Sequence, residues 1–348
     1  MGLRYSEDVE RLAVDDRIAW ERLDGSTVVV TGATGLIGGL LARVLVRRNE
    51  VVGAGIRVVL PVRNVAKAQA AFGEAAGVRI VAWDASAGAV PELDACDYVV
   101  HCASNTDSRL MVERPVDTIT TTVAGTQAML ELARAHDARM CFVSSMEVYG
   151  SGADDALDES RGGELDAMSV RSSYPQAKQL AETLCAAYAG QYGTNVCVAR
   201  LAQSFGPGIA NADRRVFAEF ARCCLEGRDI ALLTDGSKQN MYVYTADAVR
   251  ALLTLATRGE RGLAYNVANE DTFCSIYQMA QMVAKAFGTT TQVTRVVDED
   301  AARRYAVSGS IRMDVSRMRA LGWEPDYQLV DLYRRMIDDW VAPDCDIM

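Results

Sequence analysis

The glycine-rich segment T-G-A-T-G-L-I-G, residues 31–38, constrains the fold of this 348-residue chain more than any other feature. Its three glycines follow an apolar, strand-like run and open a helical pattern. The first glycine permits a tight turn, and the others let a pyrophosphate approach the helix N-terminus, where free N–H groups and the helix dipole stabilise anions. The spacing is G-x-x-G-x-x-G rather than G-x-G-x-x-G, and it predicts a dinucleotide site built from Gly32, Thr34, Gly35, Leu36, Ile37 and Gly38.

Strand-like and helical segments alternate along the chain as far as Arg200. The expected strands are Thr27–Thr31, Arg57–Leu60, Arg79–Ala82, Tyr98–His101, Met140–Ser144 and Val196–Arg200. This alternation predicts an α/β fold with a doubly wound parallel Rossmann sheet. After Arg200 the pattern changes to loops, a helix around Val216–Glu226 and short strands, which predicts a smaller, discontinuous C-terminal substrate lobe.

The expected domain boundaries follow from this change of pattern. Residues 1–25 form an N-terminal helical arm that packs outside the main sheet, and residues 26–200 plus about 241–268 form the NAD(P)-binding Rossmann domain. The substrate-binding lobe takes residues 201–240 plus about 269–348. Met241–Tyr244 and Ala264–Val267 flank a helix that starts near Asp247, and we assign both to the main sheet. The tail from Arg312 to Pro325 is expected to return to the small lobe.

Three residues downstream of the glycine turn, Ser145, Tyr174 and Lys178, indicate hydride chemistry on a bound nicotinamide. Tyr174 and Lys178 are four residues apart in S-Y-P-Q-A-K, so on a helix they share one face. A free tyrosine titrates near ~10. We expect the nearby ammonium to lower the pKa of Tyr174, in a partly desolvated cleft, until the phenol can act as a general base. An ordinary core tyrosine beside a surface lysine would give the same spacing.

The residues after the second and third strands bear on the choice of cofactor. A NAD-selective site usually has an acidic residue at the end of the second strand, where it binds the ribose hydroxyls. Here that strand ends in L-P-V-R-N, and Arg63, together with Lys67, can pair with a 2′-phosphate, which modestly favours NADP over NAD. Arg63 can equally be a solvated loop residue. Asp84 and Ala85 are expected beside the adenine, and Cys102, Ala103 and Ser104 should line the cofactor cleft next to a structural His101.

Bulk properties exclude several other classes of function. The net charge of -10 and the pI near 4.9 argue against nucleic-acid or anionic-membrane partners. Two histidines and nine cysteines without a C-x-x-C pair leave little for a metal site, so no metal is expected. The charged N-terminus lacks an apolar signal core, and no apolar run is long enough to span a membrane. We expect a cytoplasmic enzyme whose partners are small molecules.

Taken together, these motifs resemble the extended short-chain dehydrogenase/reductase superfamily, in its NAD-dependent epimerase/dehydratase family of nucleotide-sugar epimerases, dehydratases and uronate decarboxylases. The resemblance covers roughly residues 26–340. Besides the glycine turn and the tyrosine–lysine pair it includes S-S-M-E-V-Y-G at 144–150, F-G-P-G at 205–208, V-Y-T-A-D at 243–247, Y-N-V-A-N at 265–269 and L-G-W-E-P at 321–325.

The resemblance implies a redox cycle on a sugar ring. Tyr174 would take the proton of a ring hydroxyl, Ser145 would hydrogen-bond the same oxygen, and Lys178 would also hold the nicotinamide ribose. The resulting 4-keto sugar allows epimerisation, elimination or decarboxylation. Glu147 resembles the glutamate that acts at C5 in dehydratases and uronate decarboxylases, whereas Met146 replaces the acid that glucose dehydratases use, which weakens a 4,6-dehydratase. The alternative for Glu147 is a structural carboxylate.

The substrate side of the resemblance departs from the family at two positions. Gln203 stands where many sugar-nucleotide enzymes have asparagine, and Asn240 stands where an arginine commonly binds the diphosphate or a uronate carboxylate. Ser104, Gln203 and Arg304 are the expected substrate-binding residues, with Arg214, Arg215, Arg303 and Arg312 as alternatives to Arg304. The family also implies a homodimer, formed through two long helices around Thr122–Ala135 and Pro175–Ala189.

Two other functions remain open from the sequence alone. The first is a NADP-dependent reductase of a non-sugar carbonyl compound, which Arg63 and the missing arginine at Asn240 both permit. The second belongs to another class, a non-catalytic NAD(P)-sensing protein. Such a sensor would keep the glycine turn but normally lose the tyrosine–lysine pair, so the intact Ser145, Tyr174 and Lys178 argue against it.

Overall fold

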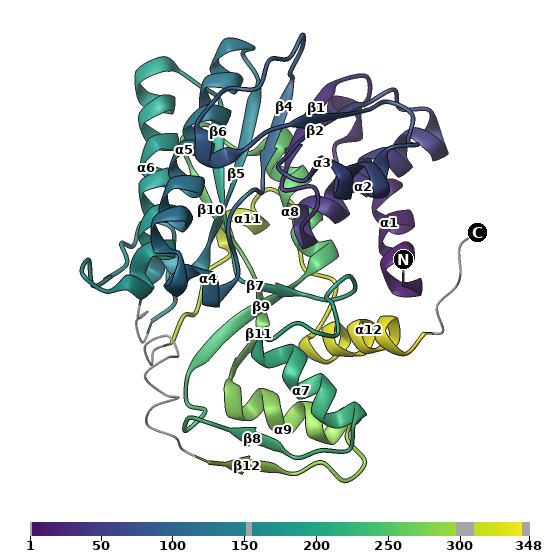
Figure 1. Ribbon diagram of the computed structural model, residues 1–348, viewed down its shortest axis with the longest axis vertical. Coiled ribbons are helices and arrows are strands. Elements are labelled where there is room, and N and C mark those ends of the chain that lie inside the picture. The colour runs from purple at the N-terminus through teal and green to yellow at the C-terminus, as the bar shows by residue number, and fades with distance from the viewer. Residues whose placement is uncertain (1, 151–154, 297–309, 343–348) are drawn as a thin grey trace.

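A computed structural model describes residues 2–150, 155–296 and 310–342. Its centre is a seven-stranded parallel sheet of the Rossmann type, as the alternating pattern predicts (Figure 1). From edge to edge the strands are β10 (Ala264–Val267), β6 (Val196–Leu201), β5 (Arg139–Ser145), β4 (Tyr98–His101), β1 (Thr27–Thr31), β2 (Arg57–Val62) and β3 (Val78–Ala82).

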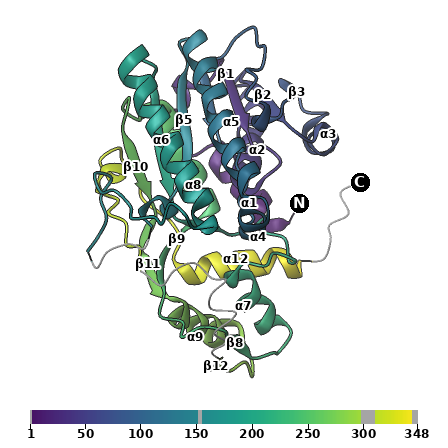
Figure 2. The ribbon, with the colours of Figure 1, turned by 60° about the vertical axis from the view of Figure 1, so that its left-hand side comes forward.

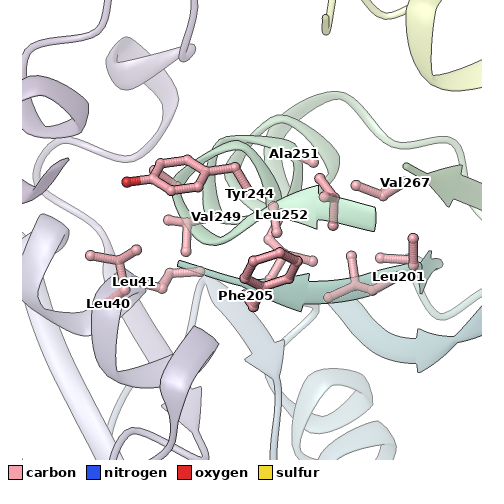
Figure 3. Packing of buried hydrophobic residues seen from close by; sticks show 14 of the residues in the cluster. Leu40, Leu41, Leu201, Phe205, Tyr244, Val249, Ala251, Leu252 and Val267 are labelled. Carbon is pink, nitrogen blue, oxygen red and sulfur yellow. The ribbon is translucent and has the colours of Figure 1, made fainter. Parts of the chain in front are cut away.

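Both faces of this sheet are covered, because alternate side chains of each strand point to opposite faces. In β1, Val28 and Val30 belong to one apolar cluster and Val29 to another, and all three are fully buried. The first cluster includes residues of α2 (Leu36–Val52) and α8 (Thr245–Arg258), and the second includes residues of α5 (Pro115–Ala135) and α6 (Ser173–Tyr192). Figure 3 shows Leu40 and Leu41 of α2 close to apolar residues of α8.

The remaining strands form two small sheets outside the main one. Strands β11 (Asn269–Ser275), β9 (Gln239–Tyr244) and β7 (Gln203–Phe205) make a three-stranded sheet, and β8 (Ile230–Leu232) pairs with β12 (Val293–Arg295). Helices α7 (Val216–Leu225) and α9 (Ile276–Phe287) pack beside β8 and β12, at the bottom of Figures 1 and 2. The shorter helices are α3 (Val65–Phe72), α4 (Ser108–Glu113) and α11 (Ser316–Arg319).

The assignment of Met241–Tyr244 to the main sheet is wrong, whereas that of Ala264–Val267 is confirmed. Met241–Tyr244 lies in β9, which pairs parallel with β7 and antiparallel with β11. A buried apolar strand that precedes a helix is typical of both a βα unit and this arrangement. Only the choice of hydrogen-bonding partner distinguishes the two, and that choice depends on residues far away along the chain. The following helix begins at Thr245, two residues before the expected position.

The tail contacts both parts of the chain. The Met313 N–H donates to the sulfur of Met241 in β9 at 2.9 Å, and the Arg312 guanidinium lies 5.6 Å from the centre of the Phe273 ring in β11. The Arg317 guanidinium donates to the carbonyl oxygen of Ala264 in β10 at 2.7 Å, and the Trp323 indole donates to the carbonyl oxygen of Asp247 in α8 at 3.1 Å. Trp323 is 2% exposed, so its burial against α8 holds this segment in place.

The first and last helices of the described chain pack against each other. The N-terminal arm forms α1 (Leu3–Ala13), and the last helix is α12 (Leu329–Val341). The carboxylate of Asp339 in α12 accepts from the backbone N–H groups of Arg4, at 2.8 Å, and of Tyr5, at 3.3 Å, and so caps the start of α1. Among the described residues, no helix is both long and apolar enough to cross a membrane.

Candidate active site

The glycine turn has the geometry that a dinucleotide needs. Gly32 has a φ of +70°, and a Cβ there would lie 2.9 Å from the Cys102 carbonyl carbon and from the Ala103 nitrogen. At Gly38 a Cβ would lie 2.6 Å from the Gly32 carbonyl oxygen. Because α2 starts at Leu36 with no side-chain cap, its first N–H groups are available to a pyrophosphate. The residues present therefore fit the phosphate part of NAD(P).

The turn lies at the point where the strand order reverses. Strand β1 pairs with β2 on one side and with β4 on the other, and ligands of such sheets bind at the carboxyl ends of the strands at this point. The segment after β4 lies against the turn, because Ala103 N–H donates to the Thr31 hydroxyl at 3.0 Å. Ser104 follows, with its Oγ 3.4 Å from the hydroxyl of Thr122.

His101 is buried within this region and has a structural role. Its Nδ1 lies 2.7 Å from the Thr31 Oγ1, and its ring stacks on Phe142 with centroids 5.7 Å apart. Burial, with the nearby Lys178 ammonium, lowers the pKa of His101 to about 3. The imidazole is therefore neutral at physiological pH and anchors β4 to β1, which agrees with its expected structural role.

The residues expected at the adenosine end lie close to one another. Arg63 is exposed directly after β2, and Asp84 is exposed after β3. Hydrogen bonds from Ser86, helped by the charge of Arg63, lower the pKa of Asp84. Ala85 is buried at the start of a short turn. The Lys67 ammonium, contributed by α3, donates to the Thr34 carbonyl oxygen of the glycine turn at 2.9 Å. A cation therefore rests directly on the turn.

Ser145, Tyr174 and Lys178 come together at the carboxyl end of β5. Ser145 ends β5 and its hydroxyl accepts from the Glu147 N–H at 3.2 Å, while Tyr174 and Lys178 lie one turn apart in α6 and are both buried. The Lys178 ammonium donates to the Val143 carbonyl oxygen at 2.7 Å and lies 4.7 Å from the centre of the Phe142 ring. Burial lowers the pKa of Lys178 to about 8.

The Tyr174 pKa is raised in the structure, opposite to the expected lowering. Burial raises the pKa well above 10, the negative charge of Glu147 raises it further, and the hydrogen bond with Ser145 and the charge of Arg171 lower it only in part. The Lys178 ammonium is 5.8 Å from the tyrosine ring centre and is engaged by Val143. The expectation considered the favourable cation and left out the desolvation of the phenolate, which is larger here.

Two cations near Glu147 were missed by the sequence reasoning. Arg171, in a short turn before α6, donates to the Glu147 carboxylate at 3.1 Å, and both side chains remain about one-third exposed or less, at 27% and 34%. Lys238 is half-buried beside the same pair, and burial lowers its pKa while the charge of Glu147 raises it. The sequence did contain a signal for Arg171, because it stands only three positions before Tyr174 in a segment already expected to contribute to the site.

The expected substrate residues have different outcomes. Gln203 is exposed at the start of β7, and Ser104 lies beside Thr122 next to the glycine turn. Arg304 lies outside the described residues, as does Arg303. Asn240 is buried in β9, and its side-chain oxygen has no hydrogen-bond partner within the described part of the chain. The structure therefore places Ser104 beside the glycine turn.

A buried polar network lies behind the end of β5. The Ser144 hydroxyl donates to the Glu182 carboxylate at 2.6 Å, and Glu182 pairs with Arg200 at 2.6 Å, with only 11% and 12% of the two side chains exposed. Arg200 also donates to the Tyr149 hydroxyl at 2.9 Å. Since Ser144 precedes Ser145 and Glu182 follows Lys178 by one turn of α6, this network fixes β5 against α6.

Comparison with known proteins finds a matching family and related sequences. The model of the NAD dependent epimerase/dehydratase family matches residues 28–268. The chain is 29% identical to UDP-glucuronic acid decarboxylase 3 of Arabidopsis thaliana over 253 residues, which are 72% of this chain and 71% of that protein. It is also 29% identical to UDP-glucuronic acid decarboxylase 1 of Xenopus tropicalis over 232 residues, 66% of this chain and 53% of that one.

Solved structures share the fold at lower identity. A dTDP-glucose 4,6-dehydratase from Streptomyces venezuelae, with NAD and TYD bound, superimposes with a TM-score of 0.75 at 22% identity, covering 90% of this chain and 96% of its own. The UDP-glucose 4-epimerase of Thermotoga maritima, with UDP-glucose, gives 0.73 at 20% identity and covers 90% and 98%. These likenesses show that most of the chain shares the fold of these structures.

Proposed function

The chain belongs to the NAD-dependent epimerase/dehydratase family, which is of the extended short-chain dehydrogenase/reductase type, and we propose that it modifies a nucleotide sugar through a transient ketone at C4. The observation that carries the proposal is the cluster of Ser145, Tyr174 and Lys178 at the sheet edge where the glycine turn lies. The small sheets and α7 and α9 would then hold the sugar nucleotide, as the substrate lobe.

The residues of the cluster have separate tasks in the proposed reaction. Tyr174 accepts the proton of the sugar hydroxyl, and Ser145 hydrogen-bonds the same oxygen. A bound nicotinamide would accept the hydride from C4 of the sugar and later give it back. Burial and Glu147 raise the pKa of Tyr174, so cationic groups have to lower that pKa when cofactor and substrate are bound. Lys178, one helical turn away, is positioned to contribute.

We further propose that the substrate is a nucleotide uronic acid and that the reaction is its decarboxylation. Arg171 and Lys238 outnumber the single carboxylate of Glu147, so the cluster beside Tyr174 has a net positive charge that suits a substrate carboxylate. A ketone at C4 is β to the C6 carboxylate. The C5–C6 bond can then break with loss of carbon dioxide, its electron pair forms an enolate, and Glu147 passes a proton from a water molecule to C5.

The likeness to UDP-glucuronic acid decarboxylases supports this choice, and Met146 disfavours a 4,6-dehydratase because a thioether cannot protonate a leaving hydroxyl. The test is incubation of the purified enzyme with UDP-glucuronate and, separately, with UDP-glucose, followed by mass spectrometry. Formation of a UDP-pentose from the uronate is the expected result. Epimerisation of UDP-glucose without any action on the uronate would instead show a 4-epimerase.

For the cofactor we infer a preference for NADP. Support comes from Arg63 after β2, from Lys67 on the glycine turn, and from the lack of an acidic residue at the end of that strand. An enzyme that returns the hydride to its own substrate can use either cofactor, so this preference is compatible with decarboxylation. Calorimetric titration with both cofactors tests it, and equal affinities or tighter NAD binding would contradict it.

The same basic residues favour a second candidate, a net NADP-dependent reductase of a carbonyl compound. A reductase consumes one reduced cofactor for each product, whereas the nucleotide-sugar reaction consumes none. The near-ultraviolet absorbance of reduced nicotinamide during turnover separates the two. A steady fall proportional to product would favour the reductase.

We also propose that the protein is a homodimer, formed through α5 and α6. Val116 and Ile119 of α5 are 71% and 41% exposed, and Leu180 of α6 is 49% exposed. Two such helix pairs related by a two-fold axis would bury these side chains in a four-helix interface.

A further inference from the structure

A cavity of about 120 Å³ lies beside the glycine turn, between the N-terminal arm and the helices that follow β1 and β2. Tyr5 of α1 lines one side, and Ala33, Thr34 and Gly35 of the turn line another. The rest of the lining comes from α2 and α3: Gly39, Arg43, Lys67, Ala71 and Phe72. Figure 1 shows α1, α2 and α3 together on the same side of the molecule. A water needs roughly 10–15 Å³ by a comparable measure, so the cavity has room for a phosphate group.

The lining is positively charged. Arg43 and Lys67 contribute two cations and Tyr5 a phenol, and of the described residues that line the cavity none carries a carboxylate. Two carboxylates that act on Tyr5 already have partners: Asp8 interacts with Tyr244 and Arg335, and Asp339 caps α1. An anion that enters this cavity therefore meets no competing charge on its walls.

Both cations are held in place by neighbours yet keep free donors. The Arg43 guanidinium lies 4.8 Å from the centre of the Phe72 ring and donates one weak hydrogen bond, at 3.4 Å, to the Ala71 carbonyl oxygen. The Lys67 ammonium uses one of its three donors on the Thr34 carbonyl oxygen. Stacking on an aromatic ring orients a guanidinium, so its remaining N–H groups are positioned for a ligand at little entropic cost.

The cavity adjoins the cofactor through the glycine turn. Thr34 and Gly35 line it and also precede the N-terminus of α2, and Lys67 follows Arg63 by four residues at the end of β2. In Rossmann folds the end of the second strand is where the adenosine ribose is recognised. We propose that this cavity receives the 2′-phosphate of NADP, and that Arg43 and Tyr5 bind it together with Lys67 and Arg63.

This assignment rests on the proposed preference for NADP and gives the N-terminal arm a part in cofactor recognition. Tyr5 is supplied by α1, outside the family-matched region 28–268, and a Cβ at Gly208 would lie 2.8 Å from its ring. The arm is thus fixed against the loop after β7. Cofactor selectivity would then depend on a segment that precedes the Rossmann sheet.

The test measures binding of cofactor fragments and not turnover. Adenosine 2′,5′-bisphosphate and 5′-AMP are titrated calorimetrically into the wild type, Arg43→Leu and Tyr5→Phe. Since a charge-assisted hydrogen bond is lost, Arg43→Leu should weaken the bisphosphate roughly tenfold to a hundredfold while leaving 5′-AMP within about twofold. Tyr5→Phe should weaken the bisphosphate about threefold, and Arg43→Lys should retain part of the affinity that the leucine variant loses.

Arg47→Leu is the matched control, because Arg47 lies one turn further along α2 and pairs with Glu10 and Glu50 outside the cavity. It should change neither affinity. Equal weakening of both fragments by Arg43→Leu, or no weakening of either, would overturn the assignment of the cavity. A wild type that binds the bisphosphate no better than 5′-AMP would instead refute the NADP preference itself, so the two failures are distinguishable.

Discussion

The buried ammonium of Lys178 should lower the free energy of unfolding of the protein. Its side chain is 2% exposed, and burial lowers its pKa from 10.5 to about 8. Below about pH 8 the Lys178 side chain is charged in both the folded and the unfolded protein, but burial makes the charged form less favourable in the folded protein. The difference between 10.5 and about 8, at about 1.4 kcal/mol for each pH unit, corresponds to about 3 kcal/mol.

Lys178→Met removes this cost and keeps a similar volume. The Val143 carbonyl oxygen loses its donor, which offsets about 1 kcal/mol. At pH 7 we therefore expect the variant to be about 2 kcal/mol more stable than the wild type and catalytically inactive. Urea unfolding measures the difference, and the same change at the exposed Lys285 is the control, with an effect within about 0.5 kcal/mol.

The pH dependence tests the cause of this effect. Between about pH 8 and 10.5 the unfolded wild type binds one more proton at this lysine than the folded protein does, so wild-type stability rises with pH across that window. The methionine variant lacks this rise, and more than half of its advantage should be gone at about pH 9.5. A variant less stable than the wild type at pH 7, or an advantage unchanged at pH 9.5, would refute the reasoning.

Other predictions concern the catalytic oxygen, the supporting network and assembly. Tyr174→Phe should slow turnover by roughly 10²- to 10⁴-fold and leave cofactor affinity nearly unchanged, and activity within a few-fold of wild type would remove Tyr174 from catalysis. Glu182→Ala leaves Arg200 buried without its carboxylate and should lower the free energy of unfolding by about 3 kcal/mol, whereas Glu226→Ala, at an exposed pair, should cost under 1 kcal/mol. Comparable losses in denaturant titrations of the two variants would show that the buried pair has no special role. Light scattering should give twice the 37.7 kDa chain mass at micromolar concentration, and a monomer mass there would rule out the dimer.

The sequence predicted the parts of the molecule that depend on local patterns. The glycine turn, the parallel strands and the shared helix face of Tyr174 and Lys178 follow from spacing within a few residues, and the structure has them all. The sheet to which Met241–Tyr244 belongs could not be read in this way, because its partners β7 and β11 are chosen by non-local packing.

The site shows the same division between local and non-local information. Arg171 reaches Glu147 across 24 positions of the chain, and Lys67 reaches Thr34 across 33. No sequence spacing predicts either contact. Burial is also a collective property, and for this reason the raised pKa of Tyr174 could not be predicted from a motif that contains only its favourable neighbour.

The most direct test of the account is single-turnover mixing of Glu147→Gln with the nucleotide uronate. The proposed chemistry oxidises C4 through Tyr174, Ser145 and Lys178 and then requires Glu147 to pass a proton from water to C5 before the ketone is reduced. The amide keeps the shape of the side chain but cannot deliver that proton. We predict that reduced cofactor accumulates to about one equivalent per active site, with a keto sugar detected by mass spectrometry. Normal turnover by the variant, with no reduced cofactor, would contradict a catalytic Glu147 and favour a reaction that needs only the other three residues.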